Sequence, residues 1–519
     1  MMQERILVTG ATGYIGGRLI KRLLEQGYAV TAMARSLEKI GCRPWAGHPK
    51  ILLAQGDVMD QASLERAMAG CSAAYYLVHS MTPGAKDFAQ TDRIAAENMV
   101  RAAEAQGLSR IIYLGGLGEE SDAHLSKHLR SRLEVAKVLR QGKVPVTFLR
   151  AAMIIGAGSA SFEILRYLTE RLPVMITPRW VRTECQPIAV SNVIEYLAGC
   201  LEHPETFGQT YDIGGPDVLT YAQMFALYTE IAGLPRRILI PVPFLTPHLS
   251  SLWINFVTPV PTALAKPLVV GLRNRVVCTE NRIQEIIPQP LLSCREAIST
   301  ALQKVQQLDV ETCWSDAGFQ PPPEWLDCGD APYAGGTLLG LSYHIRIAAK
   351  PEEVWPVVAA LGGGTGWYYG DFLWQMRGFM DRMVGGVGLR RGRRHPAEIR
   401  VGDALDFWRV LQLEPGRRLR LLAEMKVPGE ALLDFELRPI GPDGAYTEII
   451  ERSRFLPKGL WGLAYWYATY PFHILIFKGM LEKIAHQTGR AASQAKPLRP
   501  SATSSCALPG GHAAVNPDS

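Results

Sequence analysis

The sequence predicts a chain of two domains: a doubly wound α/β domain with a mostly parallel sheet, and a smaller α+β domain with an antiparallel sheet. Three observations predict this fold class. The N-terminal part alternates short apolar runs with helix-periodic segments, and the first run leads into a glycine-rich turn. Beyond residue 330 the pattern changes to several segments in which polar and apolar residues alternate. A segment rich in proline and glycine separates the two patterns, as is typical of a domain boundary.

Composition limits the classes of function. Of the 519 residues, 47% are hydrophobic and 20% are charged, so most of the chain is expected to fold. The formal net charge of +6 is spread out, and its one dense run, 390–394, is interpreted as a solvated turn, so no nucleic-acid partner is expected. The nine cysteines occur singly and not at zinc-site spacing, which favours a reduced compartment and predicts no metal. The N-terminus lacks the pattern of a signal peptide, so a cytoplasmic location is expected.

Two stretches have the apolar content of a membrane segment. Residues 238–272 hold a single charged side chain, Lys266, but six prolines would break a straight spanning helix. Residues 460–477 are interrupted by Pro471. We therefore expect no spanning helix, and leave open a peripheral contact of the proline-rich region 241–267 with the inner membrane.

The first apolar run, 5–9, is followed by a glycine turn and then by a helix-periodic segment, which is the context of a phosphate-binding loop. Gly10 permits the tight turn, Gly13 lets the backbone approach a pyrophosphate, and Gly16 allows the helix to pack closely. The helix N-terminus then directs N–H groups at the phosphates. The residues expected to bind a dinucleotide here are Thr9, Gly10, Ala11, Thr12, Gly13, Tyr14, Ile15 and Gly16.

The end of the second strand, 29–34, indicates which dinucleotide is bound. Arg35 stands where NAD-preferring proteins carry an acid for the ribose hydroxyl. A guanidinium suits a 2′-phosphate, so NADP(H) is predicted; in the alternative, Arg35 is only a solvent-exposed side chain and NAD is bound. A third strand, 51–54, then leads to Asp57 and Val58.

These motifs resemble those of a known superfamily. Thr-Gly-x-x-Gly-x-x-Gly at 9–16, Arg35, and Gly-Asp-Val-x-Asp at 56–60 are similar to the extended, atypical short-chain dehydrogenases/reductases. Segments 75–81 and 110–117 further resemble an NmrA-like branch that is related to an accessory subunit of respiratory complex I. The resemblance covers about the first 300 residues.

The resemblance implies a Rossmann domain within residues 1–325, whose substrate lobe lies mainly at 157–325. It implies that the pair Asp57 and Val58 lies against the adenine. His79, at the carboxyl end of the fourth strand, is expected to line the nicotinamide pocket, because sheet topology places ligands there. Val78 and Gly115, at the ends of the fourth and fifth strands, are expected to contact the cofactor as well.

The catalytic residues of that superfamily are not all present. Its reductases use a Tyr and a Lys four residues later, whereas the helix at 126–137 places His128 and Arg132 at the nearest equivalent positions. Gly115 and Gly116 replace the usual Ser of the fifth strand. In one interpretation His128 is a proton donor near neutral pH and Arg132 holds the cofactor ribose; in the other, both are surface residues. No catalytic residue is assigned.

The C-terminal part predicts a second domain of a different kind. A strand at 343–347 and a short helix from Pro351 precede an antiparallel meander and a long helix kinked at Pro471. The expected meander strands are 404–413, 418–425, 431–437 and 447–455, and the long helix is expected at 460–485. This order resembles the helix-grip fold of START-like ligand binders, and in particular an uncharacterised domain found fused to atypical short-chain dehydrogenases.

The second resemblance implies a START-like domain at 336–488 that encloses a cavity. Five aromatic side chains are expected to line it: Trp355, Trp408, Tyr465, Trp466 and Tyr467. The composition of residues 489–519 predicts a disordered tail.

Taken together, the motifs predict an NADP(H)-dependent oxidoreductase that acts on a hydrophobic small molecule, which the second domain binds. Because the usual Tyr and Lys are missing, a non-catalytic NADP(H) sensor, or an assembly or scaffold protein, is the alternative. The sequence indicates neither the substrate nor the oligomeric state.

Overall fold

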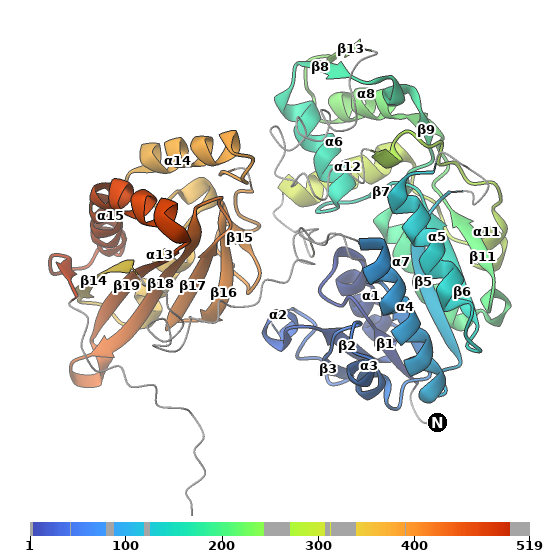
Figure 1. Ribbon diagram of the computed structural model, residues 1–519, viewed down its shortest axis with the longest axis horizontal. Helices are drawn as coiled ribbons and strands as arrows, with labels where there is room; N and C mark the ends of the chain where they lie inside the picture. The colour runs from blue at the N-terminus through green and yellow to red at the C-terminus, as the bar shows by residue number, and fades with distance from the viewer. Residues whose placement is uncertain are drawn as a thin grey trace, which may run out of the picture. The chain divides into compact units, whose positions relative to one another are not determined.

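The computed structural model describes residues 4–41, 43–78, 88–118, 125–242, 270–306, 312, 339–389 and 391–498. These residues belong to two compact units: the first spans 1–319 with 400–403, and the second spans 320–399 with 404–519 (Figure 1). We refer to them as unit 1 and unit 2. Each unit has a core of its own, so each can be described separately.

Unit 1 is built on the predicted parallel sheet. Its strands are β1 (Arg5–Val8), β2 (Ala29–Ala34), β3 (Ile51–Gln55), β4 (Ala73–Tyr76), β5 (Arg110–Gly116), β6 (Val146–Ala151) and β11 (Thr210–Ile213). They lie in the order β11-β6-β5-β4-β1-β2-β3, and every pairing is parallel. The strand order reverses between β1 and β4, which is where doubly wound sheets bind their ligands.

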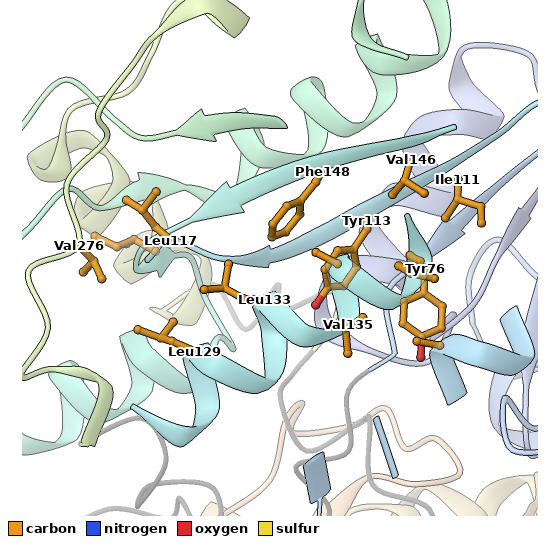
Figure 2. Close-up of a cluster of buried hydrophobic side chains, with 14 of the residues drawn as sticks. Tyr76, Ile111, Tyr113, Leu117, Leu129, Leu133, Val135, Val146, Phe148 and Val276 are labelled. Atoms are coloured by element: carbon orange, nitrogen blue, oxygen red, sulfur yellow. The ribbon is translucent and has the colours of Figure 1, made fainter. Parts of the chain in front are cut away.

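Unit 1 contains ten described α-helices, some of which cover the two faces of this sheet. They are α1 (Tyr14–Glu25), α2 (Leu37–Gly41), α3 (Gln61–Met68), α4 (Phe88–Ala105), α5 (Lys127–Leu139), α6 (Ala160–Arg171), α7 (Val190–Glu202), α8 (Tyr221–Ile231), α11 (Arg282–Ile286) and α12 (Cys294–Gln306). Apolar side chains of α3, α4 and α5 share one core, and those of α1 and α7 share the other. Figure 2 shows how Leu129 and Leu133 of α5 face the sheet, where the rings of Tyr113 and Phe148 stack with centroids 5.1 Å apart.

The substrate-lobe part of unit 1 adds short paired strands. These are β7 (Ile154–Ile155), β8 (Val174–Thr177), β9 (Glu184–Cys185), β10 (Ile188–Ala189), β12 (Leu219–Thr220) and β13 (Ile238–Pro241), with the 3-10 helices η1 (Arg179–Arg182) and η2 (Pro204–Thr206). They pair as β7 with β10, β8 with β13, and β9 with β12. Most of the proline-rich region 241–267, where a membrane contact is expected, lies outside the described residues.

Unit 2 contains the predicted antiparallel sheet. Its strands are β14 (Leu339–Ile347), β15 (Ala404–Leu405), β16 (Trp408–Glu414), β17 (Arg418–Ala423), β18 (Gly429–Ile440), β19 (Tyr446–Pro457) and β20 (Lys496–Pro497), in the order β15-β16-β17-β18-β19-β14-β20. The helices are α13 (Pro351–Ala359), α14 (Asp371–Met383) and α15 (Gly459–Gln487), with the 3-10 helices η4 (Gly363–Thr365) and η5 (Pro442–Gly444). Side chains of all three α-helices pack into one core with the sheet.

Unit 2 differs from the sequence prediction in three places. The expected strand 404–413 is two strands, because Asp406 takes a positive φ of 55° and turns the chain. Helix α14 was not predicted. Residues 489–498 belong to the unit, whereas a disordered tail was expected from 489: β20 pairs with β14, and Ala495 is buried in the core. Pairing with the open edge of β14 gives residues 489–498 a defined conformation, although their composition alone favours disorder.

Candidate functional site

The glycine loop joins β1 to α1 and has the geometry that its spacing predicts. Gly10 has φ +69°, and a Cβ on it would lie 2.8 Å from the carbonyl oxygen of Leu77. The N–H of Gly13 donates to the carbonyl oxygen of Gly10 at 2.8 Å. A Cβ on Gly16 would overlap that same carbonyl group. Side chains at Gly10 and Gly16 are therefore excluded by the turn itself, and the loop presents bare backbone.

The first turn of α1 has no side-chain cap. Gly13 occupies the N-cap position without a capping hydrogen bond, and the first turn holds no acid. By contrast, the side chains of Asp60, Ser126, Ser159 and Thr220 cap α3, α5, α6 and α8. The first N–H groups of a helix have no intrahelical acceptor, so α1 offers them to an anion.

Two arginines lie near this loop. Arg35 is exposed and directly follows β2, and its carbonyl oxygen accepts from Nε2 of Gln55 at 3.2 Å. Arg43 is buried, and its Nη2 donates to the carbonyl oxygen of Thr12 at 3.2 Å. Arg43 carries no signal in the sequence, because its position next to the loop depends on the path of the chain after α2.

The residues that follow β3 form a local turn. Oδ1 of Asp57 accepts from the N–H of Met59 at 3.0 Å, and the N–H of Asp57 donates to Oγ of Ser63 at 3.0 Å. Val58 is buried, and its carbonyl oxygen accepts from Nδ2 of Asn98 at 3.1 Å. The structure thus fixes the expected adenine-side pair at the carboxyl end of β3.

Thr9 connects the two strands at which the strand order reverses. Its hydroxyl donates to the carbonyl oxygen of Tyr75 at 2.9 Å and accepts from the N–H of Leu77 at 3.2 Å. Thr9 is fully buried, so its side chain holds β1 against β4. Val78 is half-buried at the end of this stretch, and His79 lies outside the described residues.

The remaining residues of the expected loop site differ in exposure. Ala11 is buried, and its N–H donates to the carbonyl oxygen of Met33 at 3.4 Å. Thr12, Tyr14 and Ile15 are half-buried. The carbonyl oxygen of Tyr14 also accepts from Oγ1 of Thr312 at 2.9 Å, so this first turn is held from outside the loop.

The end of β5 has no room for the serine of ordinary reductases. A Cβ on Gly115 would lie 2.6 Å from the ring of Phe148, and a Cβ on Gly116 would lie 2.6 Å from a methyl group of Leu129. Cγ of Arg132 would lie 3.9 Å from that Gly116 Cβ position, so α5 brings Arg132 to the carboxyl end of β5. His128, one turn earlier, is half-buried like Arg132.

Tyr113 lies beneath this edge and contacts the same helix. Its hydroxyl donates to the carbonyl oxygen of Arg132 at 3.2 Å. Burial raises the pKa of Tyr113, and the neighbouring Arg132 lowers it in part. A fully buried phenol whose pKa is raised keeps its proton at neutral pH, so Tyr113 serves packing in this position.

Two separate segments of unit 1, 186–193 and 210–216, are brought together. The side-chain amide of Gln186 donates to the carbonyl oxygen of Gly215 at 2.7 Å and accepts from the N–H of Cys278 at 2.9 Å. Segments 186–193 and 210–216 therefore meet although other elements separate them in the chain.

A cavity of about 230 Å³ lies between α1, α7 and α12. Its lining includes Arg18 and Arg22, and Nη2 of Arg22 pairs with Oε2 of Glu195 at 2.8 Å. None of the described lining residues belongs to the expected cofactor site. We assign this cavity no role.

In unit 2, the five aromatic residues expected around one cavity lie in different environments. Trp408 belongs to a packed aromatic cluster, with ring centroids 5.7 Å from Phe407 and 6.1 Å from Trp367. Trp466 stacks on Phe455 at 5.6 Å. Tyr467 is 66% exposed on α15, so its assignment to an enclosed cavity is wrong. The period of a helix placed Tyr467 on the face opposite to the one that packs on the sheet.

In unit 2, Glu451 is buried in the core and His473 is half-buried on α15. Glu451 is 1% exposed, neither carboxyl oxygen has a hydrogen-bond partner, and burial raises its pKa well above the ordinary value. Burial, and to a lesser extent the charge of Arg377, lowers the pKa of His473 to about 4. Both groups are therefore neutral near pH 7, which is the favoured state of a group without a charged partner in an apolar environment.

Two parts of the chain match known families. Residues 10–171 match the family described as NAD(P)H-binding. Residues 334–480 match a family described as protein of unknown function, DUF2867.

The chain is also similar to individual proteins. It is 28% identical over 240 residues to (4-alkanoyl-5-oxo-2,5-dihydrofuran-3-yl)methyl phosphate reductase of Streptomyces griseus, which covers 45% of this chain and 75% of that protein. It is 25% identical over 248 residues to mitochondrial NADH dehydrogenase (ubiquinone) 1 alpha subcomplex subunit 9 of Arabidopsis thaliana, covering 46% of this chain and 60% of that protein. The match thus spans less than two thirds of the Arabidopsis protein.

Among solved structures, the triphenylmethane reductase of Citrobacter sp. complexed with NADP(H) aligns with 57% of this chain and 99% of its own, with a TM-score of 0.47 and 22% identity. The family matches and the sheet order together identify the parts of the chain. Unit 1 carries an NAD(P)-binding Rossmann domain related to reductases and to a complex I subunit, and unit 2 carries a DUF2867 domain.

Proposed function

We propose that the protein is an NADP(H)-dependent oxidoreductase that acts on a hydrophobic small molecule. The observation that carries the proposal is the glycine loop, where bare backbone meets the uncapped start of α1. The turn excludes side chains at Gly10 and Gly16, which leaves bare backbone where a pyrophosphate would bind. The match of residues 10–171 to NAD(P)H-binding proteins supports the same assignment. The bound nicotinamide would supply hydride transfer.

The preference for NADP(H) over NAD(H) rests on Arg35 and Arg43. Arg35 stands at the end of β2 in place of an acid, and Arg43 reaches the carbonyl oxygen of Thr12. Guanidinium groups bind phosphate oxygens through charge-assisted hydrogen bonds, which suits the 2′-phosphate that only NADP(H) carries.

We assign the chemistry at the substrate to α5. Arg132, beside Gly116, would orient the cofactor ribose, and His128 would donate a proton to the reduced substrate. Unit 2 would bind the hydrophobic substrate or a related ligand as a START-like domain. Its antiparallel sheet and the packing of α15 on it support this role.

One observation favours a second candidate function. The space beside Gly115 and Gly116 is filled by Phe148 and Leu129, and no Tyr and Lys pair is present on α5. A protein with this arrangement could bind NADP(H) without turnover, as a sensor of the cofactor pool or as an assembly protein.

Calorimetric titration with NADPH, NADP, NADH and NAD tests the cofactor assignment. For Arg35→Ala we expect about a tenfold or greater loss of NADPH affinity, since a hydrogen bond between charged groups contributes about 1.5–3 kcal/mol. NADH affinity should stay unchanged. Arg101→Ala, an exposed arginine on α4, is the matched control. Absence of binding by all four nucleotides would overturn the proposal.

Turnover separates the two candidate functions. An oxidoreductase should oxidise NADPH with at least one carbonyl or quinone compound, and His128→Ala should lower that rate by about 10²-fold or more. An unchanged rate would remove His128 from the mechanism. A sensor should instead bind NADPH and NADP with different affinities and show no turnover.

A further inference from the structure

Helix α14 exposes an apolar stripe. Its members, with their exposed fractions, are Phe372 (73%), Met376 (43%), Phe379 (49%), Met380 (53%) and Met383 (68%). Their spacing places them on one face of the helix. The face that packs on unit 2 holds Trp374 and Gly378, which are buried. The helix is thus apolar on two sides, of which only one is covered.

The first half of α15 has the same property. The exposed side chains are Leu460 (83%), Trp461 (82%), Tyr467 (66%), Phe472 (48%) and Leu475 (58%). Further along the same side of the helix, Lys478, Glu482 and His486 are exposed instead. The outer face therefore changes from apolar to polar within one helix, and from Ile476 onward the inner face packs in the core of unit 2. Surface helices ordinarily carry a polar outer face along their whole length.

The two stripes belong to helices of unit 2 that contact each other. Nε of Arg377 on α14 donates to the hydroxyl of Tyr465 on α15 at 3.3 Å. Ten exposed apolar side chains on two contacting helices form a larger apolar area than the single, scattered ones that are usual on a soluble protein. We name them the apolar helix surface.

Basic side chains lie beside the apolar helix surface. The guanidinium carbon of Arg382 lies 5.5 Å from the ring centre of Phe379. Residues 458–478 hold two lysines, one at each end, and no acid; Glu430 and Glu482 lie 3.2 Å and 4.0 Å from the two amino groups. The arginines that follow α14 do not add to this charge, because Arg391 pairs with Glu424 in the interior and Arg393 donates to the carbonyl oxygens of Leu361 and Glu398.

We propose that the apolar helix surface docks unit 2 on a bilayer that contains anionic lipids. Both helices would lie in the plane of the interface, with Trp, Tyr, Phe and Met side chains at the boundary of headgroups and acyl chains. The basic groups would face the lipid phosphates. Among the described residues, no helix is long and apolar enough to cross a membrane, so the contact is peripheral.

Charge favours a bilayer over a second copy of the chain. In a symmetric dimer the same patch of both copies meets, which would bring the basic groups of each copy together. An anionic surface complements them. This inference does not depend on the oxidoreductase assignment, because it concerns the outer surface of unit 2.

The experiment is vesicle flotation of the full chain. Phosphatidylcholine vesicles are compared with vesicles of equal parts phosphatidylcholine and phosphatidylglycerol, at low and high salt. We expect binding to the anionic vesicles that high salt weakens. The double variant Phe379→Glu with Trp461→Glu should lower the bound fraction at least about tenfold, since insertion of either side chain would be lost. Both residues are exposed, and circular dichroism checks that the variant is folded.

A matched double variant tests a different apolar surface. Ile176 and Ile238 are 56% and 59% exposed on the paired strands β8 and β13 of unit 1. Ile176→Glu with Ile238→Glu should leave binding unchanged. If only this second variant loses binding, or if the first variant binds like wild type, the proposal is wrong. Absence of any vesicle binding overturns it too, and so does sedimentation showing a dimer that Phe379→Glu dissociates while vesicles remain unbound.

Discussion

Glu451 is a carboxyl group that unit 2 buries without a partner. It lies on β19 between Tyr343 of β14 and Phe435 of β18 in the register of the sheet. Burial raises its pKa, so the folded unit holds the proton that an unfolded chain would release. Such a group destabilises the fold at neutral pH, and natural proteins keep few of them.

Replacing Glu451 by Gln should stabilise unit 2 at neutral pH. The carboxyl pKa of Glu451 is higher in the folded protein than in the unfolded chain, where it is about 4.5. The stability that this group contributes is therefore fully present below pH 4.5 and is lost as the pH rises above that value. Wild type should therefore lose up to about 1.4 kcal/mol of unfolding free energy per pH unit relative to the variant. Urea unfolding between about pH 5 and 8 measures this difference. The control is Glu482→Gln, an exposed residue of α15. If the unfolding free energies of wild type and Glu451→Gln changed with pH in the same way, the burial argument would be contradicted.

At the scale of elements, the strand–turn–helix unit β1–α1 shows how one residue type sets a conformation. Gly16 lies so close to the carbonyl group of Gly10 that a Cβ on it would overlap this group. Helix α1 can therefore begin here only because residue 16 has no side chain. The uncapped first turn that results is the feature on which the nucleotide assignment depends.

Gly16→Ala should damage both this element and nucleotide binding. The added Cβ meets backbone, which cannot move away as a flexible side chain would, so unfolding free energy should fall by about 1–3 kcal/mol. NADPH affinity should fall at least about tenfold, since a displaced loop no longer aligns its N–H groups. Gly47→Ala, where a Cβ meets nothing within 4 Å, is the matched control and should change neither quantity. Wild-type NADPH affinity in Gly16→Ala would place the phosphates elsewhere.

Helix α14 shows why the buried face of one element could not be predicted. Sequence periodicity assigns the apolar face of a helix to the core. In α14 the apolar side chains gather mainly on the exposed face, as Phe372 and Phe379, whereas the buried face holds Trp374 and Gly378.

At the scale of the whole molecule, hydrogen exchange should show which unit holds the nucleotide. Saturating NADPH should slow exchange in peptides that cover the glycine loop, β2 and residues 35–43, because a bound ligand stabilises the state that binds it. Peptides from β17 to β19 report on unit 2. Slowed exchange confined to these latter strands would contradict the assignment of the cofactor to unit 1.

The sequence by itself determined the elements whose signals are local. A glycine turn needs bare backbone at Gly10, and β2 ends just before Arg35, because backbone sterics and strand patterning act between near neighbours in the chain. The parallel order of unit 1 and the antiparallel order of unit 2 followed from the same local patterns.

Only the tertiary structure decided what separate segments do to one another. It placed Arg43 against the loop, filled the space beside Gly116 with Leu129, and buried Glu451. It also left the outer faces of α14 and α15 uncovered. Burial and contact at these positions depend on segments that are distant in the chain, and local propensity carries no information about them.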